Sequence, residues 1–412
     1  MSATATPDTA PTPPSGPGSP SSGNGSRFGF LQRFAQGEMG SIQVLLALVV
    51  IWTVFTIAND RFLTSGNLVN LALQIAGIGM ISVGIVLVLL LGEIDLSVGI
   101  VSGLCSAIMA VLNVQHGWNP YLAIIAGIAA GAAIGIFQGT IVTAFGIPSF
   151  VVTLAGLIGW QGVQLWVLGD TGTVNITDPV IVGLAGTFYR GTTAWILGAI
   201  VVGLFALACL NARRRRLKAD VPAASPALVA ARVIGLAIIV FGVIYVLDQD
   251  RGVPLAILIL VGACVLFDYI VRRTRFGRYV LALGGNEEAA RRAGIRIKQI
   301  RVMVFMIAGI MAACGGILLA SRLLAVNQGS GGSDLLLLAI AGPVIAGTSL
   351  FGGRGTVWSA LLGALVIGSI SNGMDLLAFP SSTKNIVTGA VLLAAVIVDA
   401  VARQRRRAAG RV

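Results

Sequence analysis

Long uncharged apolar stretches recur along the whole chain, separated by short charged, glycine-rich or proline-rich segments. Several stretches reach about 20 residues, the length that an α-helix needs to cross the hydrocarbon of a bilayer. Charges, prolines and polar clusters divide them into about twelve predicted spans: 41–58, 67–91, 96–113, 121–145, 149–168, 192–210, 232–247, 253–271, 301–320, 335–350, 356–376 and 385–402. The pattern predicts an all-α, polytopic integral membrane protein.

The distribution of charged residues predicts how these spans are oriented in the membrane. Hydrophobic residues make up 56% of the 412 residues and charged residues 11%, and the net charge of +12 comes from bases that gather in a few loops without interleaved aromatics, which argues against nucleic acid as a partner. Because cytoplasmic loops carry the Lys and Arg excess, we place both termini in the cytoplasm. Only five of the 28 basic residues then lie outside: Arg61, Arg190, Arg251, Arg322 and Lys384. We expect a multi-pass protein of the cytoplasmic membrane, embedded in membrane lipid.

Three regions follow from this pattern. Residues 1–40 begin with Pro, Ser, Gly and Thr and predict a disordered cytoplasmic tail. Residues 41–402 form the transmembrane domain, and 403–412 a basic cytoplasmic tail. Four cysteines lie in apolar runs without metal-ligand spacing, so we expect neither a metal site nor a disulfide framework.

Two cytoplasmic loops are long. Residues 211–232 read as an irregular connector that fixes topology. In 272–301, Asn286 can cap a short helix that starts with Glu287 and Glu288 and stops at Gly294. This helix is either a solvated connector or a docking element for a partner.

The sequence GEIDLSVG, residues 92–99, places Glu93 and Asp95 between two apolar stretches. Asp95 or Ser97 can accept hydrogen bonds from the amides that start the next helix. One interpretation is a capped tight turn at the cytoplasmic surface. The other is a helix break inside the membrane that serves a transport path or gate.

A second interruption is expected at GTSLFGGRG, residues 347–355, where Gly, Thr348 and Ser349 reverse the chain. Pro343 in the preceding span predicts a kinked or broken helix, because proline removes a helix hydrogen bond. Whether this segment re-enters the membrane stays open at the level of sequence.

Small and polar residues within the spans suggest packing and binding roles. Gly127, Gly131, Gly135 and Gly139 recur every four residues on one helix face and predict close helix packing, within the subunit or against a second copy. A neutral polar solute would be bound by hydroxyl and amide groups, for which Gln138, Thr153, Gln161 and Asn372 are the candidates.

Several motifs in order give the chain a family resemblance. They are GEIDLSVG (92–99), GIPSFVVTLAG (146–156), GRYVLALGGNEEAARRAGI (277–295), SRL (321–323) and GTSLFGG (347–353). Over residues 41–402 the chain resembles the sugar permeases of the ribose, xylose and arabinose importers of the ATP-binding-cassette type. The two extra spans near 192–247 and the DRGVP motif (250–254) resemble the xylose type. One departure is Ala346, where the family's pattern has a glycine before Gly347.

The resemblance implies a function for the loop 272–301. Glu288, Ala289, Ala290 and Gly294 match the EAAxxxG motif by which such permeases dock onto their ATPase, with Gly285, Asn286 and Glu287 in the same segment. The residues agree with a separate ATPase, because Lys218, Lys298 and Lys384 follow Leu, Ile and Thr, so the chain has no Gly-Lys-Ser/Thr loop for ATP.

The resemblance also implies the rest of the assembly. It comprises a homodimer of this chain, a cytoplasmic ATPase that binds ATP and Mg, and an extracytoplasmic sugar-binding protein. The resemblance further implies that the permease itself binds no cofactor and performs no catalysis. The substrate is a pentose, D-xylose before ribose, another sugar or a nucleoside. The alternative from another class, an ion-driven secondary transporter, should bury an ionisable relay in its spans.

Overall fold

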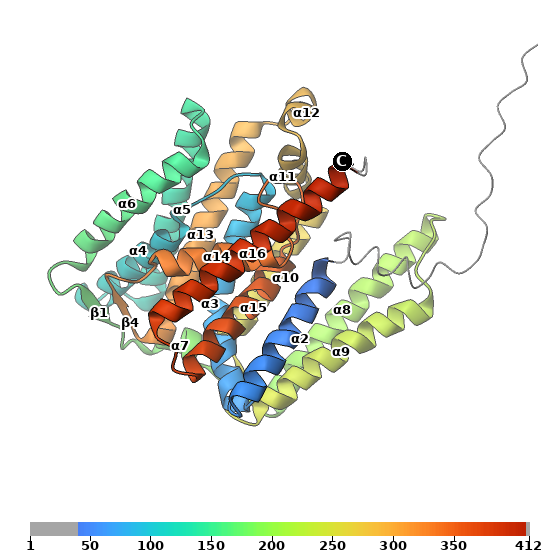
Figure 1. The fold of residues 1–412 in the computed structure, drawn as a ribbon, viewed down its shortest axis with the longest axis horizontal. Coiled ribbons are helices and arrows are strands. Elements are labelled where there is room, and N and C mark those ends of the chain that lie inside the picture. The colour runs from blue at the N-terminus through green and yellow to red at the C-terminus, as the bar shows by residue number, and fades with distance from the viewer. Residues whose placement is uncertain (1–39, 409–412) are drawn as a thin grey trace, which may run out of the picture. The chain divides into compact units, whose positions relative to one another are not determined.

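The structure is a computed structural model, and it describes residues 40–408. The part described is almost entirely helical (Figure 1). The first half contains α2 (Gly40–Ala58), α3 (Ser65–Leu90), α4 (Val98–Ala110), the π-helix η1 (Val111–Gln115), α5 (Pro120–Phe145), α6 (Ser149–Leu168), α7 (Pro179–Gly186), α8 (Thr192–Lys218) and α9 (Pro226–Asp248). The second half contains α10 (Leu255–Arg273), α11 (Arg275–Gly285), α12 (Glu287–Arg292), α13 (Ile297–Leu323), α14 (Ser333–Ile345), α15 (Trp358–Leu376) and α16 (Ser381–Ala408).

Within residues 40–408, nine helices have the length and hydropathy to cross a membrane, and two shorter apolar helices, Val44–Ala58 and Asp334–Ile345, accompany them. This confirms the predicted all-α, polytopic class. Each of the twelve predicted spans overlaps one helix. The expected tail 1–40 lies outside the described residues except for Gly40, and of the expected tail 403–412 the part to Ala408 continues α16.

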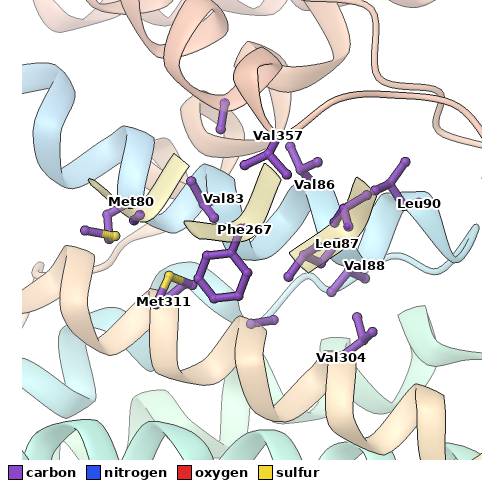
Figure 2. Close-up of a cluster of buried hydrophobic side chains, with 14 of the residues drawn as sticks. Met80, Val83, Val86, Leu87, Val88, Leu90, Phe267, Val304, Met311 and Val357 are labelled. Carbon is purple, nitrogen blue, oxygen red and sulfur yellow. The ribbon is translucent and has the colours of Figure 1, made fainter. Parts of the chain in front are cut away.

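Helix α3 forms the centre of the bundle. Its residues from Leu71 to Leu90 are nearly all buried, and α10, α13, α14 and α15 pack around it. Figure 2 shows Met80 and Leu87 of α3 among Phe267 of α10 and Met311 of α13. Because lipid is as apolar as these side chains, close packing rather than exclusion from water holds such a core together.

The glycines of α5 allow its backbone to approach its neighbours. A Cβ on Gly131 would lie 2.4 Å from the carbonyl oxygen of Gly309 in α13, and one on Gly135 would lie 2.2 Å from that of Phe305. Gly139 also faces α13, whereas Gly127 faces Cys105 of α4. The structure thus places this glycine face inside the subunit.

Helix α14 is too short to cross the hydrocarbon alone, because its 13 residues are equivalent to about 20 Å. Helix α4 also has 13 residues, but it continues directly into η1, and Val98–Gln115 together have the length of a membrane span. The long helix α3 precedes α4, and the long helix α13 precedes α14, each with an irregular segment between. The helical part of the predicted span 335–350 is shorter than expected. Pro343 lies near the C-terminal end of α14, and the helix ends after Ile345, which agrees with the broken and not the kinked helix of the two alternatives predicted from Pro343.

Helices α8 and α9 pair with each other at the edge of the bundle and fill the predicted insertion (light green in Figure 1). Most of their side chains are exposed, which fits contact with lipid. A small cluster that includes Val69, Ala194 and Ile244 joins them to α3. The backbone N–H of Gly191 donates to Asp248 Oδ1 at 2.8 Å, so the two ends of this hairpin meet.

Short antiparallel strand pairs connect the helix ends. Strand β1 (Thr173–Asn175) pairs with β4 (Ala325–Asn327), with Val174 opposite Val326. Strand β2 (Phe188–Tyr189) pairs with β3 (Val253–Pro254). The pair β1–β4 lies beyond the C-terminal end of α13, whereas α12 lies beside its N-terminal end. We call these the β4 end and the α12 end of the bundle.

Candidate functional site

The short helix α12 is capped as its sequence predicts. The backbone N–H of Ala289 donates to the side-chain oxygen of Asn286 at 2.9 Å. The helix ends after Arg292, and Gly294 follows with a φ of 76°, which glycine adopts at little cost. Ala290 is buried, while Glu288 and Arg292 form an exposed ion pair. The helix therefore has one side fixed to the protein and one side free for a partner.

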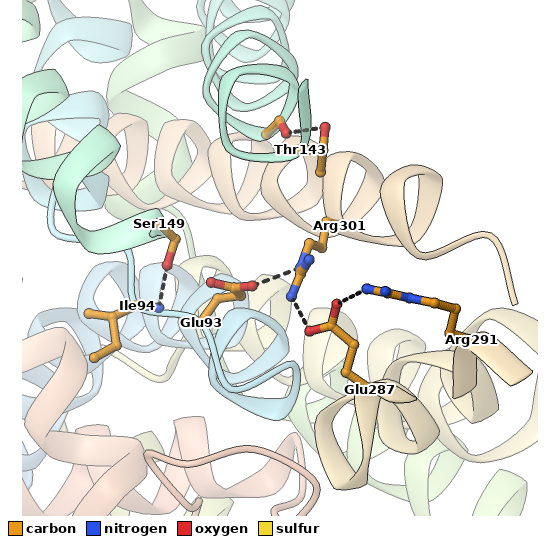
Figure 3. Close-up of polar contacts among 8 residues, drawn as sticks. Glu93, Ile94, Thr143, Ser149, Glu287, Arg291 and Arg301 are labelled. Atoms are coloured by element: carbon orange, nitrogen blue, oxygen red, sulfur yellow. Dashed lines mark hydrogen bonds and ion pairs between the residues drawn. The ribbon is translucent and has the colours of Figure 1, made fainter. Parts of the chain in front are cut away.

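A chain of charges joins α12 to the segment before α4 (Figure 3). Arg291 Nη2 lies 3.1 Å from Glu287 Oε1, and Arg301 Nη2 lies 2.8 Å from Glu287 Oε2. The Nε atom of Arg301 lies 2.7 Å from Glu93 Oε1, an ion pair without hydrogen-bond geometry. Since the side chains of Arg301 and Glu93 are only 22% and 13% exposed, solvent screens this pair less than a surface pair.

Backbones meet directly beside these charges. A Cβ on Gly284, next to the end of α11, would lie 1.7 Å from the carbonyl oxygen of Leu90. That same oxygen accepts a hydrogen bond from the N–H of Gly353 at 3.0 Å. A Cβ on Gly352 would lie 2.9 Å from the nitrogen of Gly92. We call Gly92, Gly284, Gly352 and Gly353 the glycine junction; it brings together α3, α11 and the loop before α15.

The segment from Glu93 to Ser97 is irregular and partly buried: Asp95 and Ser97 are buried, whereas Ile94 is exposed. Asp95 Oδ1 accepts hydrogen bonds from the N–H and the hydroxyl of Ser97, at 2.8 and 2.7 Å. The Ser97 hydroxyl lies 2.9 Å from Nε2 of Gln138 on α5. Asp95 is 7% exposed and Ser97 is fully buried. Asp95 thus holds the start of α4 in the way expected of a cap, but inside the protein.

Helix α6 holds the other side of this segment. The N–H of Ile94 donates to Ser149 Oγ at 3.1 Å, and the N–H of Leu96 donates to Thr153 Oγ1 at 3.0 Å. These two hydroxyls satisfy backbone groups that a helix would have paired internally. The irregular backbone is therefore supported by protein and not by lipid.

The depth of the segment follows from its neighbour. Gln138 lies seven residues before Phe145, the last residue of α5, which corresponds to about 10 Å along the helix. Glu93, in contrast, reaches Arg301 near the first residue of α13. Residues 93–97 therefore lead from the α12 end into the bundle, so of the two interpretations the geometry favours an embedded break over a surface turn.

The other candidates from the sequence lie elsewhere. Thr348 is buried, and its Oγ1 lies 2.6 Å from Ser359 Oγ, while Ser349 turns the loop by accepting from the N–H of Phe351. Asn372 exchanges side-chain hydrogen bonds with Asn67 of α3, at 2.8 and 3.0 Å. Gln161 is exposed on α6. The structure groups Asp95, Ser97, Gln138 and Thr153, but not these four.

Sequence reasoning missed two partners of the segment 93–97, Arg301 and Ser149, and also the buried Gln164 of α6. Arg301 was read only as the end of a basic loop, and Ser149 only as part of a motif. Gln164 of α6 is fully buried and donates to the carbonyl oxygens of Asn327 and Ser330, whereas Gln161, one turn earlier, was the residue chosen. Arg301 alone carried a signal, because it is a charge placed at the start of a long apolar stretch.

Comparison with known proteins gives the family. Residues 67–396 match the family described as branched-chain amino acid transport system / permease component. The chain is 37% identical over 363 residues to the xylose transport system permease protein XylH of Escherichia coli (strain K12), covering 88% of this chain and 92% of that protein. It is 36% identical to XylH of Haemophilus influenzae, covering 86% and 95%, and 33% identical to the ribose import permease protein RbsC of Bacillus subtilis, covering 88% and 94%.

No solved structure matches the chain. The family match covers well over half of the residues, and the xylose and ribose permeases align along nearly their whole length. This chain therefore belongs to the branched-chain amino acid transport system / permease component family of multi-pass membrane proteins.

Proposed function

We propose that this chain is the membrane-spanning permease subunit of an ATP-driven importer that moves a pentose, D-xylose, across the cytoplasmic membrane. The similarity to the xylose transport system permeases supports the substrate, and ribose is the next candidate. The proposal includes a homodimer around the path, an extracytoplasmic sugar-binding protein and a cytoplasmic ATPase that binds ATP and Mg. The α12 end then faces the cytoplasm, as the charge distribution predicts.

The observation that carries the proposal is the contact of Arg301 with both Glu287 and Glu93. Glu287 belongs to the exposed helix α12, on which a partner can dock, and Glu93 starts the partly buried segment that leads to α4. A displacement of α12 by the partner would therefore be transmitted to a helix inside the bundle.

The glycine junction adds a second route from the same partner. Gly284 next to the end of α11 contacts the last turn of α3 without intervening side chains. Because a partner can shift the permease only through contacts that differ between two states, the docking surface must touch the elements that move. Both routes begin in the segment 275–294 and end at membrane helices.

The test is uptake by the complete system in proteoliposomes. The purified chain is reconstituted with its ATPase and binding protein, and labelled D-xylose and D-ribose are supplied separately. We expect ATP-dependent accumulation of xylose that needs all three components. Accumulation by this chain alone, driven by a proton or sodium gradient without ATP, would contradict the proposal and favour a secondary transporter.

A further inference from the structure

A cavity of about 460 Å³ lies towards the β4 end, between α4, α13 and the loop that leads into α14. Its wall carries Ser102 and Ser106 of α4, Asn327 at the end of β4, Ser330 of the following loop, and Asp334 of α14. Gly103 and Gly316 complete the wall where the helices approach most closely. The volume falls in the range of small-molecule sites.

The cavity lies within the thickness of the membrane. The Ser82 hydroxyl of α3 donates to the carbonyl oxygen of Ala339 in α14, and Ser82 is eight residues, or about 12 Å, from the end of α3 at Leu90. Asp334 lies five residues before Ala339, about 7.5 Å further towards the β4 end. Asp334 is thus about 20 Å from the α12 end, inside a hydrocarbon layer of about 30 Å.

An exposed carboxylate at this depth requires water or a polar partner. Asp334 is exposed, and in the part of the chain that the structure describes no basic side chain pairs with it. A charged group facing lipid costs several kcal/mol, and charges inside membrane segments mark pathways for polar solutes. We therefore expect Asp334 to face water or a polar partner and not lipid.

The remaining wall groups are mainly acceptors. The hydroxyls of Ser102 and Ser106 donate to the carbonyl oxygens of Gly99 and Gly103, at 2.6 and 2.8 Å, so their lone pairs can still accept. Gln164 does not line the cavity, but its Oε1 is buried without a hydrogen-bond partner next to the wall residue Gly103, 2.9 Å from the place where a Cβ on Gly103 would sit. Such a wall suits a ligand that brings hydroxyl donors.

We propose that this cavity is a site on the translocation path that holds a neutral polyol, the pentose itself, with Asp334 accepting hydrogen bonds from its hydroxyls. The inference rests on the proposed function and extends it by naming where the sugar passes. A carboxylate binds a hydroxyl more strongly than a neutral acceptor does, so Asp334 carries most of the selectivity for a hydroxylated solute.

The first test measures the sugar moved per ATP hydrolysed, at saturating loaded binding protein, for Asp334→Ala, Asp334→Asn and Ser106→Val. We expect this ratio to fall about tenfold for Asp334→Ala and Ser106→Val and less for Asp334→Asn, which keeps an acceptor oxygen. ATP hydrolysis stimulated by the loaded binding protein should remain. The control is Asp170→Asn, an exposed acid of the loop between α6 and β1, which should change nothing.

The second test reports access without relying on transport. In a cysteine-free version, Asp334→Cys should react with a charged thiol reagent, and D-xylose should slow the reaction at least threefold, unlike sodium chloride of equal osmolality. Val114→Cys, exposed on η1, should react without protection. Protein yield and monodispersity in detergent are compared first, so that only folded variants are scored.

The outcomes separate the two proposals. If the unaltered system transports xylose but the Asp334 variants match it and the cysteine is unreactive or unprotected, the cavity inference is wrong. Protection by sodium chloride as strong as that by xylose overturns it as well, because a cation then occupies the site. If the unaltered system fails to take up sugar, it is the proposed function that fails.

Discussion

Glu93 lies where the docking helix meets the break before α4. Its ion pair with Arg301 is shielded, in contrast to the exposed pair of Glu288 with Arg292. Exposed pairs contribute about 0–1 kcal/mol, whereas loss of one partner from a buried pair leaves a costly unpaired charge. Loss of Glu93 should therefore cost more stability than loss of Glu288.

Glu93→Gln should uncouple hydrolysis from transport. Without the negative charge, Arg301 keeps only Glu287, and the link from α12 to the segment 93–97 is weakened. We expect about fivefold less xylose moved per ATP, with ATP hydrolysis retained, in proteoliposomes. The control is Asp268→Asn, which removes a more exposed ion pair, with Arg272 at 2.8 Å, away from this site, and it should change the ratio less than twofold. Normal coupling in Glu93→Gln would refute the proposed route.

Asp95 allows its capping role to be separated from its charge. Asp95→Ala removes the acceptor of two hydrogen bonds from Ser97 and should destabilise the protein by about 1–2 kcal/mol, seen as a lower thermal unfolding temperature in detergent. Asp95→Asn keeps an acceptor oxygen and should unfold like the unaltered protein. Reduced uptake by Asp95→Asn at unchanged membrane abundance would assign a role to the charge; full uptake would leave only the cap.

The capping residues could be predicted from the local sequence, but their neighbours' long-range partners could not. The caps of Asn286 and Asp95 depend on amides within three residues, so a sequence pattern can identify them. The partners Arg301 and Ser149 are far along the chain from Glu93 and Ile94, and only packing brings them together.

Helix α5 illustrates what periodicity can and cannot reveal. The four-residue spacing of its glycines predicts a face for close packing, yet it leaves open whether the partner is another helix of the same chain or a second copy. Gly309 and Phe305 of α13 fill that place in the structure. The sequence of an apolar helix face predicts that it packs closely, but it does not identify which helix it packs against.

Gly309→Ala should separate α13 from α5. The new Cβ would lie 2.0 Å from the carbonyl oxygen of Gly131, and both atoms belong to rigid helices. We expect a loss of about 1–3 kcal/mol, measured as a lower unfolding temperature in detergent and lower membrane abundance. Gly162→Ala in α6, where nothing lies within 4 Å, is the matched control and should be neutral or stabilising. Equal behaviour of the two variants would contradict this packing.

Of the twelve predicted spans, 335–350 differs most from its helix in the structure, the short helix α14. The run 335–350 is apolar throughout, and hydropathy alone cannot show that the chain leaves the helix after Ile345. Nor does it show that the preceding loop contacts α4, where a Cβ on Gly103 would lie 2.0 Å from the carbonyl oxygen of Ser330. Half-length helices become visible only when their depth relative to neighbours is known.

For the molecule as a unit, the α8–α9 hairpin is an addition to a bundle that surrounds α3. Its ends meet through Gly191 and Asp248, so residues 192–247 can be replaced by a short Gly-Ser linker without stretching the chain. We expect this deletion to retain a folded, membrane-inserted protein with at least half of the xylose uptake. Replacement of 120–168, which removes α5 and α6, should abolish both. Loss of folding in the first deletion would show that the hairpin belongs to the core.

Orientation gives a further test of the molecule as a unit. The charge distribution predicts that the α12 end faces the cytoplasm. A cysteine replacing Arg292, whose side chain is 79% exposed, should therefore react with a membrane-impermeant reagent in inside-out vesicles and stay unlabelled in intact cells. Labelling in intact cells would remove the ATPase from reach of α12.

The glycine junction has a mechanical consequence. Where side chains separate two elements, rotamer changes can absorb a small displacement before the neighbour responds. Between Gly284 and Leu90 there is only backbone, and the hydrogen bond from Gly353 occupies the same oxygen. We therefore expect a displacement of the end of α11 to reach the C-terminal end of α3 through direct backbone contact. A methyl group added at Gly284 would force the two backbones apart, because its Cβ would lie 1.7 Å from the Leu90 carbonyl oxygen.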